Sequence, residues 1–323
     1  MSELDRLPVA EREQAVPAPA PADAELMKAV LERRSFSDHG WIFERKLDGI
    51  RCLAIRSGPQ TRLLSRNDLD LGDRYPEIRA AVAAQAHDRF AIDGEVVAFD
   101  GAQTSFARLA QRGRHPVPVF LYVFDLVWLD GYDIRSLGLR TRKRLLRAAI
   151  RFEDPLRWTS HRNQDGEAMF AEACRKGWEG VVAKRADSPY RATRSRDWLK
   201  FKCEAGQELV IGGYTAPHGS RTDFGALLVG YYADGALQYA GKVGTGFDHE
   251  MLSSLGRRLR ELRRDSSPFA DPGTIRERGA SWVKPQLVAE LGFTEWTSAG
   301  RLRHPRFLGL RDDKPAAQVV RER

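Results

Sequence analysis

The hydrophobic pattern of the chain changes character near residue 205. Before this point, apolar runs with strand spacing alternate with runs of helical spacing. The strand-like runs cover 41–46, 50–56, 90–99, 119–128, 180–184 and 197–202. The helical runs cover 141–150, opened by Thr141 as N-cap, and 165–176, opened by Asp165 and closed by Gly177. This mixture predicts an α+β domain over residues 25–204.

After residue 205 the apolar runs are shorter and mostly strand-like. They cover 208–214, 225–232, 236–243, 281–284 and 287–296. One helical run near 248–264 carries leucines at 252, 255, 259 and 262, which fall on a single helical face. Short strands with one helix are typical of a small barrel, so we expect an OB-fold domain over 205–314. Residues 315–323 are expected to form a flexible C-terminal tail.

The first 24 residues differ from both domains in composition. They hold five acids and two arginines, and residues 15–22 are built almost entirely from alanine and proline. A segment of this kind has little apolar surface to bury, so we expect a disordered acidic tail over 1–24. Its net charge of −3 leaves +11 on the rest of the chain.

Composition and charge narrow the class of protein. At 42% hydrophobic residues the chain is globular, and its apolar runs are too short to span a bilayer. The start lacks the pattern of a secretory signal, and the three cysteines form no C-x-x-C pair. We therefore expect a cytoplasmic protein without a zinc site, a disulfide framework or a membrane partner. The net charge of +8 favours a nucleic-acid partner, although a genome that prefers arginine codons gives the same composition.

The stretch Lys46-Leu47-Asp48-Gly49-Ile50-Arg51 follows an apolar strand and contains the strongest candidate nucleophile. A lysine attacks only when neutral, and partial burial or nearby cations such as Arg51 lower its pKa. Gly49 permits a sharp turn or a close approach of the backbone. The alternative is a strand-end lysine that pairs with Asp48.

Two further strands carry charged side chains in a pattern that suits phosphate. In Asp197–Lys202, alternation places Lys200 and Lys202 on one face, a costly arrangement unless an anion lies between them. An edge strand protected by lysines is the alternative. In Glu179–Lys184, a carboxylate at the strand entrance suggests Mg²⁺ near phosphates, and a simple salt bridge is the alternative.

Four weaker candidates acquire meaning only together with these motifs. Each has an ordinary structural explanation, as a turn acid, a core aromatic residue, a loop arginine or a charged surface turn. They are Glu95 after Asp93-Gly94, Phe124, Arg66 after Ser65, and the turn Arg311-Asp312-Asp313-Lys314.

The order of these motifs resembles the covalent nucleotidyltransferase superfamily, and specifically the ATP-dependent DNA ligases, over about residues 25–314. Several segments resemble the ligase module of bacterial non-homologous end-joining ligases. They are Gln207–Tyr214, Gly219–Gly230, Gly241–Phe247 and Glu295–Lys314. Ile50 and Ala192 stand where that group often has an aromatic residue and a proline.

The resemblance implies an adenylation (nucleotidyltransferase) domain followed by an OB domain, with Lys46 as the residue that ATP adenylates. It also implies nucleotide contacts: Glu44 to adenine, Arg51 and Arg66 to phosphate, Glu95 to ribose, Phe124 and Val182 around adenine, Lys200 and Lys202 to the α-phosphate, and Arg311 and Lys314 to the leaving pyrophosphate. The implied metal ligands are Glu179 and Asp48, for Mg²⁺ or Mn²⁺.

The resemblance further implies a substrate and a setting. We expect a monomeric, stand-alone bacterial ligase, associated with the nucleoid, that uses ATP to seal nicked double-stranded DNA in repair and recombination. A Ku-like end-binding protein is a candidate partner. The alternatives are an RNA ligase or capping-type nucleotidyltransferase, which shares most of the motifs, and a catalytically silent nucleic-acid clamp.

Overall fold

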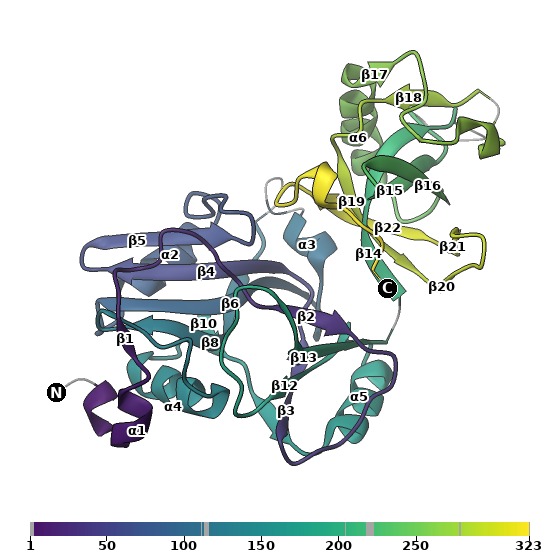
Figure 1. Ribbon diagram of the computed structural model, residues 1–323. Helices are drawn as coiled ribbons and strands as arrows, with labels where there is room; N and C mark the ends of the chain where they lie inside the picture. Colours follow the sequence, from purple (N-terminus) through teal and green to yellow (C-terminus); the bar gives the residue numbers. More distant parts are fainter. Residues whose placement is uncertain are drawn as a thin grey trace. The chain divides into compact units, whose positions relative to one another are not determined.

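The computed structural model describes residues 3–110, 112, 116–203, 205–217, 223–277 and 279–322. Its contacts divide into two compact units, Met1–Cys203 and Glu204–Arg323 (Figure 1). The division lies one residue before the one expected from the hydrophobic pattern. Glu204 itself, and residues 219–222 of the segment that resembles end-joining ligases, lie outside the described residues.

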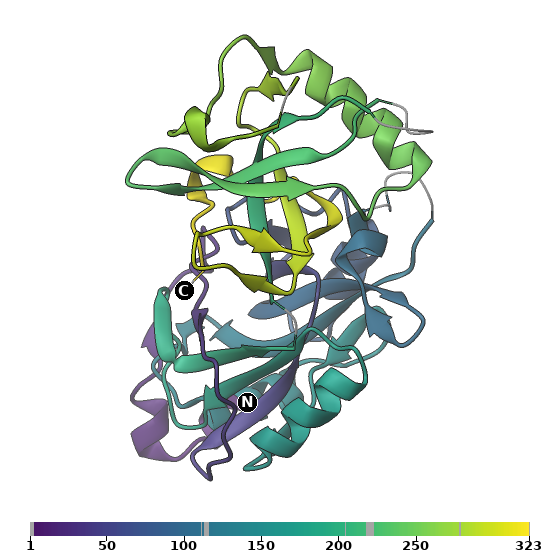
Figure 2. The same cartoon turned by 90° about the vertical axis from the view of Figure 1, so that its right-hand side faces the viewer.

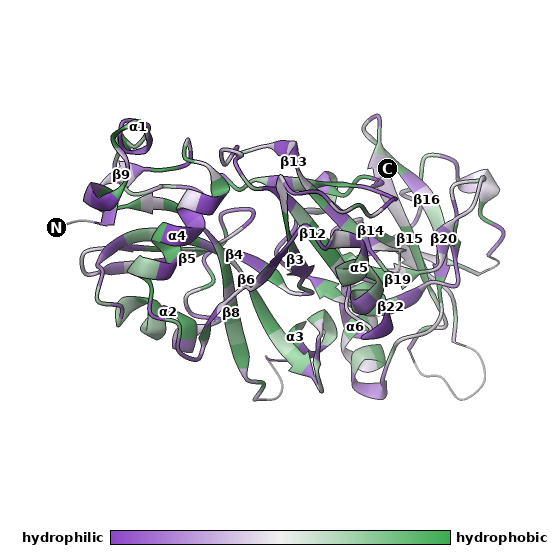
Figure 3. Cartoon of the chain, turned by 90° about the horizontal axis from the view of Figure 1, so that it is seen from below, coloured by the Kyte–Doolittle hydropathy of each residue, from purple (hydrophilic) through white to green (hydrophobic). Residues whose placement is uncertain are grey.

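The first sheet of the N-terminal unit has the strand order β1-β9-β8-β6-β4-β5, with β10 paired to β8 and β7 to β6. Its strands are β1 (Val16–Pro17), β4 (Ile50–Ser57), β5 (Gln60–Ser65), β6 (Arg89–Asp100), β7 (Gln103–Thr104), β8 (Val119–Leu129), β9 (Tyr132–Asp133) and β10 (Leu156–Trp158). The long strands β6 and β8 are buried over most of their length and are coloured as hydrophobic in Figure 3. Such runs are expected of strands covered on both faces.

The second sheet has the order β11-β3-β12-β13-β2. Its strands are β2 (Lys28–Leu31), β3 (Trp41–Lys46), β11 (His161–Asn163), β12 (Gly180–Arg185) and β13 (Arg194–Lys202). Phe43, Val181 and Phe201 form a core cluster with residues of helix α5 (Gly166–Arg175). Alternation along each strand therefore turns the neighbouring polar side chains to the opposite face.

The helices confirm the predicted periodicity but correct one predicted start. They are α1 (Val9–Arg12), α2 (Pro76–Ala83), α3 (Phe106–Ala110), α4 (Leu139–Ala149), α5 and α6 (His249–Glu261), with short 3₁₀ turns η1 (Glu3–Arg6), η3 (Pro272–Thr274) and η4 (Ala316–Gln318). Gly138, not Thr141, is the N-cap of α4, and Thr141 is buried within the first turn. Gly177, just after α5, has φ of 66°, the left-handed conformation expected where a helix ends.

The described residues of the C-terminal unit form short strands and one long helix. The strands are β14 (Ala205–Tyr214), β15 (Leu227–Ala233), β16 (Ala236–Val243), β17 (Arg263–Arg264), β18 (Ser281–Val283), β19 (Val288–Phe293), β20 (Glu295–Trp296), β21 (Leu302–Arg303) and β22 (Arg306–Arg311). Helix α6 lies against these strands (Figure 2) and buries Leu252, Leu255 and Leu259 in their core. Asp248 caps it by accepting a hydrogen bond from the Met251 amide at 2.7 Å.

Both expected tails are ordered where the structure describes them. Leu4 and Leu7 lie in the core of the N-terminal unit, and β1 pairs with β9. A short apolar segment becomes ordered here because an existing strand edge accepts its backbone and tolerates Pro17. At the other end, Val319 is fully buried against the barrel strands. The expectations of a disordered 1–24 segment and a flexible 315–323 segment are therefore wrong for the described residues.

The cysteines also correct an expectation. Cys174 at the end of α5 and Cys203 just after β13 form a disulfide with their Cα atoms 5.2 Å apart. Their separation of 29 residues concealed this proximity, which follows from the packing of α5 on the second sheet. Among the described helices, none has both the length and the apolar character needed to cross a bilayer.

Candidate active site

Five of the thirteen predicted site residues lie on one face of the second sheet. The strand register places Lys46 beside Gly180 and Gly180 beside Lys202. Two residues further along, Glu44 lies beside Val182, and Val182 beside Lys200. Since β13 runs between β12 and β2, it is not an edge strand, and edge protection does not explain its lysines.

Lys46 and Lys202 share one carboxylate. The Nζ atom of Lys46 is 2.6 Å from the Glu179 carboxylate, and that of Lys202 is 4.0 Å from it. The side chains of Lys46, Lys202 and Glu179 are all partly exposed, at 20%, 12% and 25% in that order. Lys46 thus pairs with Glu179 and not with Asp48. One carboxylate between two ammonium groups leaves an excess of positive charge, which suits a phosphate chain.

The residues after Lys46 hold the motif loop in place. Asp48 accepts a hydrogen bond from the Phe106 amide at 2.9 Å, at the start of α3, and its own amide donates to Thr104 Oγ1 at 3.1 Å. A Cβ atom at Gly49 would lie 2.1 Å from the Val96 carbonyl oxygen. The glycine therefore permits a close approach between β4 and β6, and Asp48 fastens the loop to α3.

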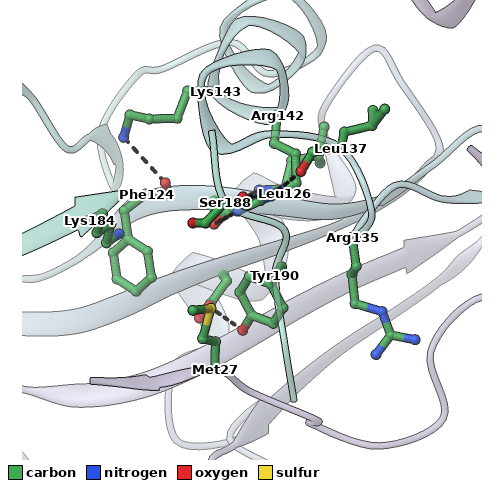
Figure 4. A network of polar contacts seen from close by, with 12 residues as sticks. Met27, Phe124, Leu126, Arg135, Leu137, Arg142, Lys143, Lys184, Ser188 and Tyr190 are labelled. Atoms are coloured by element: carbon green, nitrogen blue, oxygen red, sulfur yellow. Dashed lines mark hydrogen bonds and ion pairs between the residues drawn. The ribbon is translucent and has the colours of Figure 1, made fainter. Parts of the chain in front are cut away.

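Glu44 is a buried residue of the face that carries Lys46, and it lies between two lysines. Its carboxylate is 2.5 Å from Lys143 Nζ and 2.6 Å from Lys184 Nζ. Burial alone would raise the pKa of Glu44, but the two lysine charges outweigh it and lower that pKa. Burial lowers the pKa of Lys184 to about 8, against the opposing attraction of Glu44. Lys143 also donates to the Phe124 backbone oxygen at 3.2 Å (Figure 4).

Arg51 reaches the site from the first sheet and is held by a buried acid. Its guanidinium donates two hydrogen bonds to the Asp93 carboxylate, at 2.5 and 2.6 Å. The Tyr190 hydroxyl donates a third hydrogen bond to the same carboxylate, at 2.6 Å. Burial would lower the pKa of Arg51, but the Asp93 charge raises it, so the guanidinium stays charged. Its Cζ atom lies 4.7 Å from the centre of the Phe124 ring, and Lys184 Nζ lies 4.1 Å from it.

The remaining candidates of the N-terminal unit flank Arg51. Glu95 on β6 pairs in register with Arg51 on β4, and Arg66 directly follows the last residue of β5. Both side chains are partly exposed. Because β5 and β6 both pair with β4, the first sheet brings Glu95 and Arg66 to the neighbourhood of Arg51, whereas Phe124, at 7% exposure, is largely covered.

Arg311 and Lys314 lie in the C-terminal unit, and acids engage both. Arg311 donates two 2.8 Å hydrogen bonds to Asp313 and lies 3.3 Å from Glu290. Lys314 is 3.0 Å from Glu208. Burial would lower the pKa of Arg311, but its acidic neighbours raise it. We call these five residues the acid-paired cluster.

The sequence assigned no site role to four residues that the fold brings to the site. Lys143 and Tyr190 were missed outright, and Asp93 and Lys184 were named only as parts of motifs. One signal was available for Lys143. Together with Arg142, it falls on the stripe of α4 that Leu139 and Leu146 define, so a cation occupies a helix face that packs inward. Arg142 is likewise fully buried, with two hydrogen bonds to Asp125 at 2.8 and 2.9 Å.

The described residues include no group of three acidic, histidine or cysteine side chains that could hold a metal by themselves. Glu179 is the carboxylate nearest to Lys46. Mg²⁺ is commonly bound by one or two carboxylates together with substrate phosphates, and a single acid on a lysine face fits that mode.

Comparison with known proteins identifies both units. Residues 21–202 match the family model of the ATP dependent DNA ligase domain, and residues 220–314 match that of the ATP dependent DNA ligase C terminal region. A solved structure, "mycobacterial DNA ligase D complexed with ATP and MES", is 37% identical in sequence to this chain and superposes with a TM-score of 0.68. The match covers 92% of this chain and 98% of the chain in that structure. The predicted pair of an adenylation domain and an OB-fold domain is thereby confirmed.

Curated relatives are longer than this chain. The chain is 41% identical over 296 residues to the multifunctional non-homologous end joining protein LigD of Pseudomonas aeruginosa, covering 88% of the chain and 35% of that protein. It is 40% identical over 286 residues to the corresponding protein of Mycobacterium tuberculosis, covering 87% of the chain and 37% of that protein. The chain therefore spans about a third of the length of these relatives.

Proposed function

Because the chain belongs to the ATP-dependent DNA ligase family, we propose that it seals nicks between a 5′-phosphate and a 3′-hydroxyl in duplex DNA, with Lys46 as the adenylated residue. The observation that carries this proposal is the position of Lys46 at the end of β3, on the same face as Lys200 and Lys202. These two lysines can neutralise the α-phosphate on which a neighbouring amine acts.

Three displacements at phosphorus make up the reaction. Lys46 Nζ attacks the α-phosphate of ATP, a nitrogen–phosphorus bond forms, and pyrophosphate leaves with the electrons of the broken bond. The 5′-phosphate of the nick then displaces the lysine and takes the AMP. The 3′-hydroxyl finally attacks that 5′-phosphate and releases AMP. Since charge builds on phosphate oxygens in each step, cations that stabilise it contribute most of the catalysis.

The chain's own residues divide this work. Lys46 must leave its ion pair with Glu179 before it attacks, because a lysine attacks only as the neutral amine. Glu179, assisted by Asp48, would then hold Mg²⁺ or Mn²⁺, which neutralises phosphate charge when bound. Glu44, Glu95, Phe124 and Val182 would bind the nucleoside, and Arg51 and Arg66 would contact phosphate.

The test is covalent labelling with ATP carrying phosphorus-32 at the α-position. The wild-type chain should acquire label from ATP and not from GTP, and Lys46→Ala should acquire none. Lys176→Ala is the matched control, since Lys176 directly follows α5, has a side-chain exposure of 55% and pairs with Glu172. Sealing of nicked DNA but not of nicked RNA would separate a DNA ligase from an RNA ligase. Label in Lys46→Ala would contradict the assignment.

We also propose that the chain acts at broken DNA ends in the bacterial nucleoid. The support is its similarity to relatives that are named as non-homologous end joining proteins. In that setting a Ku-like end-binding protein would recruit it. Joining of linear duplexes, measured with and without such a protein, tests this role, and equal rates would contradict the partnership.

A further inference from the structure

Lys46, Lys200 and Lys202 share one face of the second sheet, which we call the lysine face. A second cationic site lies beside it. It is a cavity of about 380 Å³ between α4 and the edge of the second sheet. Its lining includes Arg140, Lys143, Arg144, Arg147, Trp158 and His161. We call it the α4 cavity. Its volume lies in the range of small-molecule binding sites.

The α4 cavity is separate from the place where Lys46 lies. Ile42, which lines the cavity, is four residues before Lys46 on β3, and side chains at these positions share a face. At 3.3 Å per residue they are roughly 13 Å apart along the strand. Glu44 lies between them and separates the two places.

The charge of the cavity is only partly balanced. Arg144 pairs with Glu11 at 2.9 Å, and Lys143 shares Glu44 with Lys184. Arg140, by contrast, donates to the neutral amide of Asn163 at 2.8 Å. The lining cations therefore outnumber the acids that reach them, which favours an anion with more than one charge.

Two ring systems complete the site. Lys143 Nζ lies 4.5 Å and Arg147 Cζ 5.3 Å from the centre of the Trp158 ring, so cations line the face of this ring. His161 Nδ1 is buried without a hydrogen-bond partner. Burial, followed by the nearby Lys143 charge, lowers the pKa of His161, so the ring stays neutral and can donate from one nitrogen.

We propose that the α4 cavity binds a small polyphosphate anion, either inorganic pyrophosphate or the phosphates of a nucleotide, independently of the lysine face. Arginine side chains supply the charge, and the ring of His161 forms part of the lining. Lys143 lines the cavity and also pairs with Glu44, one of the proposed nucleoside contacts. An anion in the cavity would therefore be linked to the nucleotide site through Lys143. The binding itself does not depend on ligase activity.

The test is calorimetric titration of the full chain with sodium pyrophosphate in metal-free buffer. The variant Arg140→Gln/Arg147→Gln should weaken one binding event by at least about tenfold, since charged hydrogen bonds are lost. Lys200→Ala/Lys202→Ala should retain that event. The matched control is Arg151→Gln/Arg196→Gln, which removes two exposed arginines with side-chain exposures of 77% and 71%. It should also retain the event.

The proposal fails if the cavity variant binds like wild type, or if the control loses as much affinity. Each single variant, Arg140→Gln and Arg147→Gln, is titrated too, and thermal unfolding checks its fold, so poor folding of the double variant leaves the test intact. Titration of Trp158→Leu separates the two ligand sources. Weaker AMP binding with unchanged pyrophosphate binding identifies a nucleotide, whereas equal retention of both identifies pyrophosphate.

Discussion

The two units of the chain treat their candidate phosphate-binding cations in opposite ways. On the lysine face, one carboxylate, that of Glu179, lies between Lys46 and Lys202. In the acid-paired cluster, the single guanidinium of Arg311 lies against two carboxylates. Lys46, Lys202 and Glu179 together carry a net charge of +1. Arg311 with its two acids, Asp313 and Glu290, carries a net charge of −1. A phosphate is therefore attracted to the lysine face directly.

This difference indicates different roles in the reaction. The lysine face can hold the α-phosphate through all three steps, because that phosphate is present in each. Arg311 and Lys314 must exchange their acids for a phosphate before they can act. We therefore expect them to act in one step, when pyrophosphate leaves and a triphosphate is available to compete with the acids.

The largest effect is expected at the nucleophile. Lys46→Arg keeps the positive charge and can keep the ion pair with Glu179, but a guanidinium does not deprotonate and cannot attack. Labelling by ATP should fall to background. Retained folding, measured by thermal unfolding, is the control. Label in this variant would show that a residue other than Lys46 is adenylated.

A large effect on stability is expected from a buried ion pair of the N-terminal unit. Arg142 and Asp125 are both 0% exposed, so Asp125→Asn leaves a buried charge without its partner, at a cost of about 3–5 kcal/mol. Asp313→Asn in the other unit leaves Arg311 beside Glu290 and should cost less, about 1–3 kcal/mol. Urea unfolding of both variants checks this order. Equal losses would remove the distinction between the two units.

Lys200→Ala should slow sealing by about 100-fold, the scale found when one preorganised donor to a transition state is removed. The rate of nick sealing in a single turnover measures it. Arg194→Ala, on the same strand but exposed, is the control and should change little. A loss of the same size in the control would point to general DNA attraction instead.

The smallest effect is expected when the acid-paired cluster is loosened. Glu208→Gln removes the charge that holds Lys314 at 3.0 Å. Because Lys314 then exchanges partners more easily, the rate of labelling by ATP should rise by a few fold at most, in line with a weak, partly exposed ion pair. A fall in this rate would show that Glu208 positions Lys314 for its task.

Local patterns in the sequence were sufficient to predict the lysine face. Alternation along β13 placed Lys200 and Lys202 on one side, and the strand register confirms it. The helical spacing of the leucines in α6 was also confirmed. These predictions succeeded because each depends on residues within one strand or one helix.

Contacts between distant segments could not be predicted in this way. Lys143 is 99 residues from Glu44, and Tyr190 is 97 residues from Asp93. Single-strand periodicity carries no information on such pairs, which depend on how the two sheets and α4 pack. The ordered first segment was missed for the same reason, since its strand partner β9 lies more than a hundred residues away.

The most direct test of the two-role account compares ordinary nicks with nicks that already carry AMP on the 5′-phosphate. Sealing rates are measured on both substrates for Lys314→Ala and Lys200→Ala. We predict that Lys314→Ala fails on ordinary nicks but seals pre-adenylated nicks at close to the wild-type rate, whereas Lys200→Ala is impaired on both. An equal defect of Lys314→Ala on the two substrates would contradict the account.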